Sequence, residues 1–524
     1  MINQTKRPKP VVLIILDGWG LAPASKGNAI SLAKPENTDY FWDNYPHTTL
    51  KAHGKYVGLP DEQDGNSEAG HLNLGAGRTV LQDSVYIFQS IKDGTFFKNA
   101  AFIEAISHLK KHKTKIHLMG LLTEEQSPHA SLDHLLSLLE LVKINKLEPV
   151  CLHLFTDGRD SSQHGAIKFL KKLKDGFKNG EVISSVSGRF YAMDRKKDWN
   201  NIEKVYNALV LGEGEKVESP EEALLHAYNK GLTDEYVPPS IVVKNNKPVG
   251  LIEDNDAIIF FNLRSDRARE LTKAFVQKNF NQLNPDAFKR KKIPQNIRFV
   301  AMTDFGPDLP DVFSAFPSRD VINSLPFALN GLKQLYIAET EKFAHVTYFF
   351  NGGYADPVAG EERIKIPSLK INHYDQKPEM SAYEITKTVK EKIKIDEYDF
   401  ILINFANPDM IGHTGNLEAG IKACKITDEC AGEIARKVLE KNGTAIITAD
   451  HGNAEEMIDL KTNEIDTGHS ANLVPFIIVK KGLKNKKIKL TEGTLGDVAP
   501  TILDLMGINK PKEMKGKSLL NPNI

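Results

Sequence analysis

The sequence is poor in cysteine, balanced in charge and free of long apolar runs. Its three cysteines form no CxxC pair and no even set, so a disulfide framework is excluded and reduced thiols in a cytoplasm are the simplest interpretation. The 68 basic and 68 acidic residues cancel, which gives no support to a nucleic-acid or anionic-membrane partner. No apolar run approaches the length of a membrane span. We therefore expect a soluble, cytoplasmic protein.

Length and apolar patterning indicate α/β structure. At 524 residues the chain is too long for one ordinary core, so two or three domains are expected. Four short apolar runs end in polar, glycine-containing turns, as strands covered on both faces do: residues 11–16, 400–403, 444–448 and 475–479. Helix-period segments at 380–393 and 419–441 predict a largely parallel sheet. A buried strand also explains residues 11–16 better than a secretory signal, whose apolar core is longer.

The middle of the chain predicts a second α/β domain, over residues 83–316. Its expected strands alternate with helical segments and cover residues 115–122, 149–155, 182–187 and 257–262. Candidate metal ligands lie both before and after this region. We therefore expect an inserted domain, a discontinuous first domain formed by residues 1–82 and 317–524, and two linkers that act as a hinge.

Candidate metal ligands fall on the strand-end loops of the first domain. They are Asp17, Ser67, Asp409, His413, Asp450, His451 and His469. Mixed carboxylate and imidazole sets suit Mn²⁺ or Zn²⁺ better than an all-oxygen Mg²⁺ or Ca²⁺ cage. Asp409 and His413 are four apart and share one side of a helical turn. Asp450 and His451 are adjacent, so both can bind a metal only from a loop, which Gly452 permits.

Three of the candidates also have an ordinary explanation when taken alone. Asp17 suits an Asp-Gly turn, His469 suits a surface or core histidine, and Ser67 suits a helix N-cap. Their common placement at strand ends favours function. Two metals would also explain Ser67, because one would lower the pKa of its hydroxyl and the other would neutralise phosphoryl oxygens during transfer.

Arginine is scarce, at 13 of 68 basic residues, yet five arginines cluster in motifs of the middle domain. They are Arg159, Arg189, Arg195, Arg264 and Arg267, and each follows a predicted strand. The guanidinium fork suits phosphate and carboxylate, so the set predicts a small substrate carrying both groups. The alternative is structural pairing with the neighbouring Asp160, Asp194 and Asp266.

Together these motifs resemble the cofactor-independent phosphoglycerate mutases, a branch of the alkaline phosphatase superfamily. The similarity runs over nearly the whole chain. Its most specific segments are residues 16–20 (LDGWG), 65–68 (GNSE), 75–78 (GAGR), 157–160 (DGRD), 191–195 (YAMDR), 261–264 (FNLR), 337–342 (IAETEK), 350–353 (FNGG) and 448–453 (TADHGN).

The resemblance implies an alkaline-phosphatase-like three-layer sandwich with an inserted second α/β domain. It implies two divalent ions, commonly Mn²⁺ with Co²⁺, Zn²⁺ and Mg²⁺ as alternatives. One ion would take Asp409, His413 and His469, and the other Asp17, Ser67, Asp450 and His451.

Ser67 would accept phosphate from 3-phosphoglycerate and return it to give 2-phosphoglycerate, without bisphosphoglycerate. Substrate contacts would come from His129, Arg159, Asp160, Arg189, Arg195, Arg264, Arg267 and Lys342. Asp160 would shuttle the proton, and Lys342 would donate to the phosphoryl group.

One segment departs from the family pattern. Residues 123–131 are one residue longer than expected, and Ser131 replaces a histidine, whereas His129 keeps its spacing to Asp133.

Two alternative functions stay open. Among enzymes, the alternative is a metal-dependent phosphomonoesterase or a mutase for another phosphorylated small molecule. Outside enzymes, it is an inactive metal-binding scaffold. We expect a monomer whose partner is its small-molecule substrate.

Overall fold

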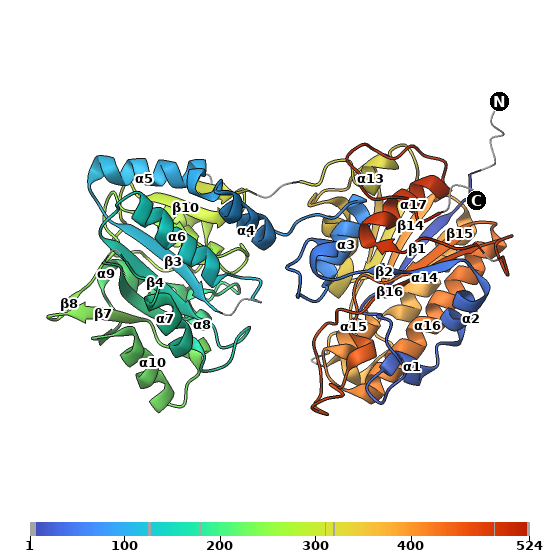
Figure 1. The fold of residues 1–524 in the computed structure, drawn as a ribbon, viewed down its shortest axis with the longest axis horizontal. Coiled ribbons are helices and arrows are strands. Elements are labelled where there is room, and N and C mark those ends of the chain that lie inside the picture. The colour runs from blue at the N-terminus through green and yellow to red at the C-terminus, as the bar shows by residue number, and fades with distance from the viewer. Residues whose placement is uncertain are drawn as a thin grey trace. The chain divides into compact units, whose positions relative to one another are not determined.

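The computed structural model describes residues 7–520, apart from 124–126, 179, 310, 318, 319, 372 and 487. It divides the chain into two compact units. Unit 1 comprises Met1–Gln82 and Arg319–Ile524, and unit 2 comprises Asp83–Ser318. In Figure 1 the two chain segments of unit 1 carry the two ends of the colour range, blue and yellow to red. Unit 2 is therefore an insertion, with its second boundary two residues beyond the expected one.

Unit 1 is built on an eight-stranded sheet with the order β13-β12-β14-β1-β15-β16-β2-β17. Pairing is parallel from β13 to β15, whereas β16 is antiparallel to both of its neighbours. The central strand β1 is wholly buried. The strands are β1 Val11–Leu16, β2 His47–Lys51, β12 Gln334–Glu339, β13 Glu362–Ile366, β14 Phe400–Phe405, β15 Thr444–Thr448, β16 Val474–Lys480 and β17 Gly493–Thr494.

Helices form two layers around this sheet. In one layer α16 packs against α1, α2 and α14, and in the other α3, α13 and α17 contact one another (Figure 1). The helices are α1 Ala29–Ala33, α2 Glu36–Asn44, α3 Ser67–Ala76, α13 Leu325–Ala328, α14 Ala382–Ile395, α15 Asn407–Gly412, α16 Leu417–Glu440 and α17 Val498–Leu505. The predicted three-layer α/β fold is confirmed.

Unit 2 has its own nine-stranded sheet, ordered β11-β10-β9-β3-β4-β5-β7-β6, with β8 pairing with β7. Pairing is parallel from β11 to β5. The strands are β3 Ile116–Leu122, β4 Val150–Thr156, β5 Val182–Gly188, β6 Glu215–Val217, β7 Ser240–Lys244, β8 Lys247–Pro248, β9 Ala257–Phe260, β10 Arg298–Thr303 and β11 Val312–Phe316.

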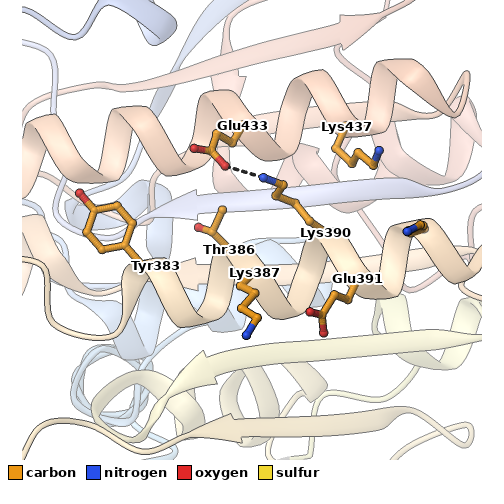
Figure 2. Close-up of a pocket in the computed structure, with 8 residues that line it drawn as sticks. Tyr383, Thr386, Lys387, Lys390, Glu391, Glu433 and Lys437 are labelled. Atoms are coloured by element: carbon orange, nitrogen blue, oxygen red, sulfur yellow. Dashed lines mark hydrogen bonds and ion pairs between the residues drawn. The ribbon is translucent and has the colours of Figure 1, made fainter.

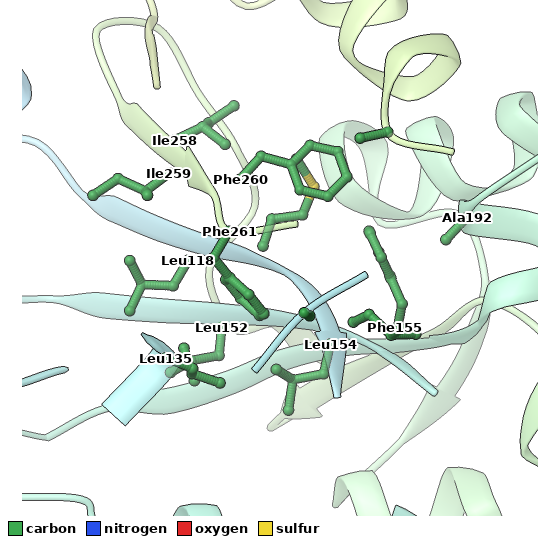
Figure 3. Close-up of a cluster of buried hydrophobic side chains, with 14 of the residues drawn as sticks. Leu118, Leu135, Leu152, Leu154, Phe155, Ala192, Ile258, Ile259, Phe260 and Phe261 are labelled. Atoms are coloured by element: carbon green, nitrogen blue, oxygen red, sulfur yellow. The ribbon is translucent and has the colours of Figure 1, made fainter. Parts of the chain in front are cut away.

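The core of unit 2 consists of aliphatic and aromatic side chains from adjacent strands. Figure 3 shows Leu118, Leu152 and Phe260 from β3, β4 and β9 among the buried apolar residues. The helices are α4 Asp83–Asp93, α5 Ala100–His112, α6 Leu132–Ile144, α7 Ala166–Lys174, α8 Arg189–Ala192, α9 Trp199–Leu211, α10 Pro220–Asn229, α11 Arg269–Val276 and α12 Phe280–Leu283. Among the described helices of both units, none combines the length and the apolar character that crossing a membrane requires.

Candidate active site

The seven candidate ligands of unit 1 gather at one edge of its sheet. Asp17 directly follows β1, Asp450 and His451 follow β15, and Asp409 lies on α15 after β14. These three strands run parallel, so their carboxyl ends meet at one edge, where ligands of α/β sheets bind. Asp17, Asp409, Asp450 and His451 are all buried.

Ser67 is the first residue of α3, but it does not cap the helix. The cap is Asn66, whose side chain accepts from the Ala69 N–H at 2.9 Å. The alternative assignment of Ser67 as N-cap is therefore wrong. The Ser67 hydroxyl instead contacts His451 Nε2 at 2.9 Å, Lys342 Nζ at 2.7 Å and Asp17 Oδ1 at 3.2 Å.

Close backbone packing holds α3 against the ligand loops. A Cβ on Gly65 would lie 2.2 Å from the Ala52 carbonyl oxygen, and one on Gly70 would lie 2.6 Å from that of Asp450. Both distances are far below van der Waals contact. Only glycine therefore lets the start of α3 approach the loop after β15 this closely.

The carboxylates and imidazoles form two overlapping groups. The ligand atoms of Asp409, His451 and His469 lie within 4.8 Å of one another, and so do those of Asp17, His71 and Asp450. His413 joins the first group, because its Nε2 lies 3.3 Å from Asp409 Oδ1 and 3.1 Å from the Nε2 of His469. All seven predicted residues thus lie in one cluster.

The three histidines present the same ring nitrogen to the cluster. Nδ1 of His413 lies 2.8 Å from the Thr467 carbonyl, and Nδ1 of His469 lies 2.8 Å from that of Gly65. Nδ1 of His451 lies 3.2 Å from the carbonyl of the next residue. Carbonyl oxygens only accept, so each Nδ1 carries a proton and each Nε2 faces the cluster, where a bound metal ion would replace any proton on it. Metal-binding histidines in proteins are commonly held in this way.

A buried cation already lies among these carboxylates. Lys342 Nζ is 2.7 Å from Asp17 Oδ1 and 2.6 Å from Asp409 Oδ2. Burial disfavours the charge on each group, but mutual attraction outweighs burial, so the Lys342 pKa is raised and the Asp17 and Asp409 pKa values lie well below their usual range. Burial likewise lowers the pKa of His451, but Asp450 and the other carboxylates outweigh it and raise that pKa to about 10.

These features fit the binding of divalent cations. The donor set combines carboxylate with imidazole, and Asp450 Oδ2 is buried and accepts no hydrogen bond within the described residues. Carboxylates concentrated in a buried site need positive charge, which metal ions supply.

The substrate candidates of unit 2 also follow parallel strands. Arg159 and Asp160 come after β4, Arg189 after β5, and Arg264 after β9. His129 precedes α6, and its carbonyl accepts from the Leu263 N–H at 2.7 Å. Because β9, β3, β4 and β5 are parallel, these residues share one edge of the sheet.

Pairing with aspartate differs among the arginines. Arg189 is buried and contacts Asp157 at 2.5 Å and Asp160 at 2.7 Å, so its role is partly structural. Arg195 contacts Asp266 at 2.9 Å, with about half of its side chain exposed. Arg195 therefore pairs with one of the three aspartates of the structural alternative, although not with its sequence neighbour Asp194.

The remaining unit 2 candidates complete this basic group. Arg267 Nη1 donates to the Met193 carbonyl at 3.2 Å. Arg159 Nη1 lies 3.7 Å from Glu235, with 55% of its side chain exposed. Burial, with further contributions from nearby arginines, lowers the Arg267 pKa.

The unusual loop before α6 is only partly described, because residues 124–126 lie outside the described part of the chain. Within the remainder, His129 Nε2 is 3.8 Å from Asp160 Oδ2. Burial, reinforced by Arg189, lowers the His129 pKa to about 4. His129 therefore faces Asp160 as a neutral imidazole.

Sequence reasoning missed several polar residues around the unit 1 cluster. His71, Asn404, Asn453 and Glu455 are buried and contact the ligands or their loops. His71 had a signal, since it lies four residues after Ser67 on α3. Asn404 and Asn453 had none beyond their placement at strand ends.

A separate surface cavity lies between α14 and α16 (Figure 2). Its volume is about 370 Å³, and four lysines and two glutamates line it. Lys390 donates to Glu433 at 2.7 Å. None of the candidate ligands lines this cavity.

Comparison with known proteins agrees with this geometry. The model of the metalloenzyme superfamily matches residues 9–510. The chain is 48% identical over 515 residues to a 2,3-bisphosphoglycerate-independent phosphoglycerate mutase of Clostridium novyi, covering 98% of this chain and 99% of that one. It is also 48% identical over 518 residues to the enzyme of that name from Clostridioides difficile, with the same coverage.

A solved structure extends the comparison to the fold. The phosphoglycerate mutase of Leishmania mexicana, crystallised at low cobalt concentration, is 31% identical with a TM-score of 0.77, covering 99% of both chains. The full-length match in sequence and in fold leads to one conclusion. This chain belongs to the 2,3-bisphosphoglycerate-independent phosphoglycerate mutase family of the metalloenzyme superfamily.

Proposed function

We propose that this chain interconverts 3-phosphoglycerate and 2-phosphoglycerate through a phosphoserine on Ser67, with two Mn²⁺ ions and no bisphosphoglycerate. The observation that carries the proposal is the Ser67 hydroxyl. It is buried at the start of α3, and Asp17, His451 and Lys342 all lie within 3.2 Å of it. A hydroxyl held among charged groups at a helix N-terminus suits nucleophilic attack on a phosphoryl group.

His451 lies between the two groups of ligands, and we assign it to the Asp17 position, because its Nε2 is 3.5 Å from Asp17 Oδ1 and from Asp450 Oδ2 but 4.0 Å from Asp409 Oδ1. Asp409, His413 and His469 would hold one ion, and Asp17, Ser67, Asp450 and His451 the other. When bound, such ions lower the pKa of a serine hydroxyl and neutralise phosphoryl oxygens. The Nε2 orientation shared by the three histidines supports this assignment.

The chain's own groups would act in two transfer steps. Ser67 Oγ attacks the phosphorus, and the bond from phosphorus to the glycerate oxygen breaks as phosphoserine forms. The other glycerate hydroxyl then attacks the phosphoserine and regenerates Ser67. Lys342, whose Nζ contacts Ser67 Oγ at 2.7 Å, would donate to the phosphoryl oxygens in both steps.

Unit 2 would recognise the glycerate part and move its proton. Arg159, Arg195, Arg264 and Arg267 would bind carboxylate and phosphate, and Arg189 would hold Asp160 in place. Burial opposes ionisation of Asp160, but Arg189 outweighs burial and keeps the Asp160 pKa below its usual value. Asp160 would therefore begin as a carboxylate that takes the proton of the attacking glycerate hydroxyl and passes it to the glycerate oxygen released from phosphorus, with His129 beside it.

We further propose a monomer working in a reducing compartment. Cys151, Cys424 and Cys430 are all buried free thiols, which suits a cytoplasm. Light scattering on the purified protein under reducing conditions should give a single species of the chain mass, 58.4 kDa.

The test is the conversion of 3-phosphoglycerate by metal-stripped protein, with Mn²⁺ added back and bisphosphoglycerate absent. We expect 2-phosphoglycerate to form only after Mn²⁺ is restored, with no net release of phosphate. Release of free phosphate without isomerisation would instead support a phosphomonoesterase, and absence of both products would support an inactive scaffold.

A further inference from the structure

We propose that three residues position the carboxylate ligands of the two metal ions. Asn404 and His71 orient Asp17 and Asp450 at one metal position. Asn453 orients Asp409 at the other. The inference rests on the two-metal site of the proposed function. None of these three residues is in the proposed ligand set, and all three are at most 1% exposed.

The hydrogen bonds of His71 indicate that it positions ligands and does not itself bind a metal ion. Its Nδ1 lies 3.0 Å from the Ser67 carbonyl oxygen and 3.2 Å from Asp450 Oδ2. Both atoms are acceptors, so Nδ1 carries the proton. The other ring nitrogen, Nε2, accepts from Asn404 Nδ2 at 3.0 Å. Both nitrogens are thus engaged, and His71 has no lone pair left for a metal ion.

Asn404 connects this histidine to the second carboxylate. Its Nδ2 also donates to Asp17 Oδ2 at 2.7 Å. The opposite amide orientation would place a carbonyl oxygen against the Asp17 carboxylate and is therefore disfavoured. Hydrogen bonds run from Asp17 through Asn404 to His71, and the Nδ1–H of His71 lies 3.2 Å from Asp450 Oδ2, an oxygen that accepts no hydrogen bond within the described residues. The chain thus places a polar N–H beside the second carboxylate of the same metal position.

Asn453 does the same for the other position. Its Nδ2 donates to Asp409 Oδ1 at 3.1 Å, on the oxygen that faces His413 and His469. Its backbone N–H donates to the buried Glu455 at 2.9 Å, which fixes where the side chain begins. Within the described residues, the hydrogen bond from Asn453 to the ligand set is made to Asp409 alone.

Substitution by leucine distinguishes a positioning role of Asn404 and Asn453 from a purely structural one. Oδ1 of Asn404 and Oδ1 of Asn453 are buried and make no hydrogen bond within the described residues. Leucine removes this unsatisfied acceptor, but it also removes the Nδ2 donor to a buried carboxylate, so its effect on stability is the sum of a gain and a loss. If these residues served only the fold, leucine would change the free energy of unfolding and would leave the Mn²⁺ affinity of the folded protein unchanged.

The experiment is Mn²⁺ titration of full-length, metal-stripped protein by calorimetry, checked by the spin-resonance signal of free Mn²⁺. The variants are Asn404→Leu and Asn453→Leu, each made in the wild type and in His413→Ala, which removes a ligand of the Asp409 position. In the His413→Ala background one ion should remain, at the Asp17 position, and Asn404→Leu should weaken the affinity for it about 10–100-fold. Asn453→Leu should leave the affinity for that ion unchanged in the same background. In the otherwise wild-type protein, which binds two ions, Asn453→Leu should weaken the affinity for one of them.

Thermal unfolding of each metal-stripped variant provides the control for folding. We expect each variant to fold and to unfold cooperatively, with a melting temperature at or below that of the parent because a buried carboxylate loses one donor. Unchanged Mn²⁺ affinities, or both substitutions weakening the same ion, would overturn the inference. A wild type that binds two ions without isomerising phosphoglycerate would contradict only the proposed function, whereas one that binds fewer than two would overturn both.

Discussion

At the scale of single residues, the neighbours of each functional group decide what it does. Ser67 begins α3, but Asn66 takes the capping role and leaves the Ser67 hydroxyl among charged groups. Arg189 and Arg195 are both arginines of the basic set, yet one is buried between two aspartates and the other is half exposed. Identical side chains therefore carry different shares of structure and function.

The first prediction concerns the nucleophile. Ser67→Ala should abolish isomerisation and phosphoenzyme formation, because no other side-chain hydroxyl of the described residues forms a hydrogen bond with Asp17, His451 or Lys342. Its melting temperature should stay close to that of the wild type, since the Asn66 cap remains. The measurement is intact-protein mass after incubation with substrate, with Ser90→Ala, on α4 of unit 2, as the matched control. Retained turnover in Ser67→Ala would exclude the covalent mechanism.

The second prediction separates the two arginines. Arg189→Ala leaves Asp157 and Asp160 without their buried cation and should cost ~3–5 kcal/mol of stability. Arg195→Ala breaks a half-exposed pair and should cost less than ~1 kcal/mol, while lowering kcat/KM at least about tenfold through the lost substrate contact. Denaturant unfolding and steady-state kinetics measure the two effects. A stable Arg189→Ala protein, or unchanged kinetics in Arg195→Ala, would contradict these roles.

At the scale of elements, a buried polar chain crosses the sheet of unit 2. Asp256 Oδ2 lies 3.0 Å from His117 Nε2, and His117 Nδ1 lies 2.9 Å from His153 Nε2. His153 Nδ1 in turn lies 2.8 Å from Ser185 Oγ. The chain links β3, β4 and β5 with the residue before β9 inside an otherwise apolar core. Burial lowers the pKa of both histidines, because charging them there is unfavourable.

The third prediction is a loss of stability in acid. A histidine whose pKa is lower in the folded than in the unfolded protein contributes its full stabilisation above its unfolded pKa of about 6.5. That stabilisation is lost as the pH falls below about 6.5, because the unfolded chain then binds a proton that the folded protein does not. Each such histidine changes the free energy of unfolding by up to ~1.4 kcal/mol per pH unit. Replacing His153 with Gln should flatten the dependence of unfolding free energy on pH between 7 and 5. His164→Gln, at an exposed site, should retain the wild-type slope; an unchanged slope in both variants would contradict the assignment.

At the scale of the whole molecule, chemistry divides between two units with separate cores. Unit 1 holds every proposed metal ligand, and unit 2 holds the basic set and its aspartates. The insertion leaves the eight-stranded sheet of unit 1 continuous. Metal binding is therefore expected to stabilise the loops of one unit directly.

The fourth prediction follows from this division. At a Mn²⁺ concentration 100 times Kd, binding stabilises the folded site by ~2.7 kcal/mol, which slows opening-limited hydrogen exchange about 100-fold. Protection should appear in α3 and in the loops after β1, β14 and β15. Segments of β3 to β5 should not change. Equal protection in both units, or none in either, would contradict a metal site built only from unit 1.

The fold and most of the cluster were predictable, because continuous apolar runs predict strands and strand ends predict loops. Residues 11–16 and 444–448 are strands as expected, and Asp17, Asp450 and His451 follow them. The strand predicted at 257–262 ends at Phe260, and the short strands β2, β6 and β17 were not predicted, since two to five residues carry little periodicity.

The sequence by itself determined which chemical groups are present and at which strand ends they lie, because those depend on local apolar pattern and on residue type. Only the tertiary structure decided their partners. Lys342 contacts a carboxylate 325 residues away, and Asn404 reaches one 387 residues away. Strand order and loop packing set such contacts, and no local pattern encodes them. The same applies to which nitrogen of His71 carries its proton, since that depends on acceptors brought together by folding.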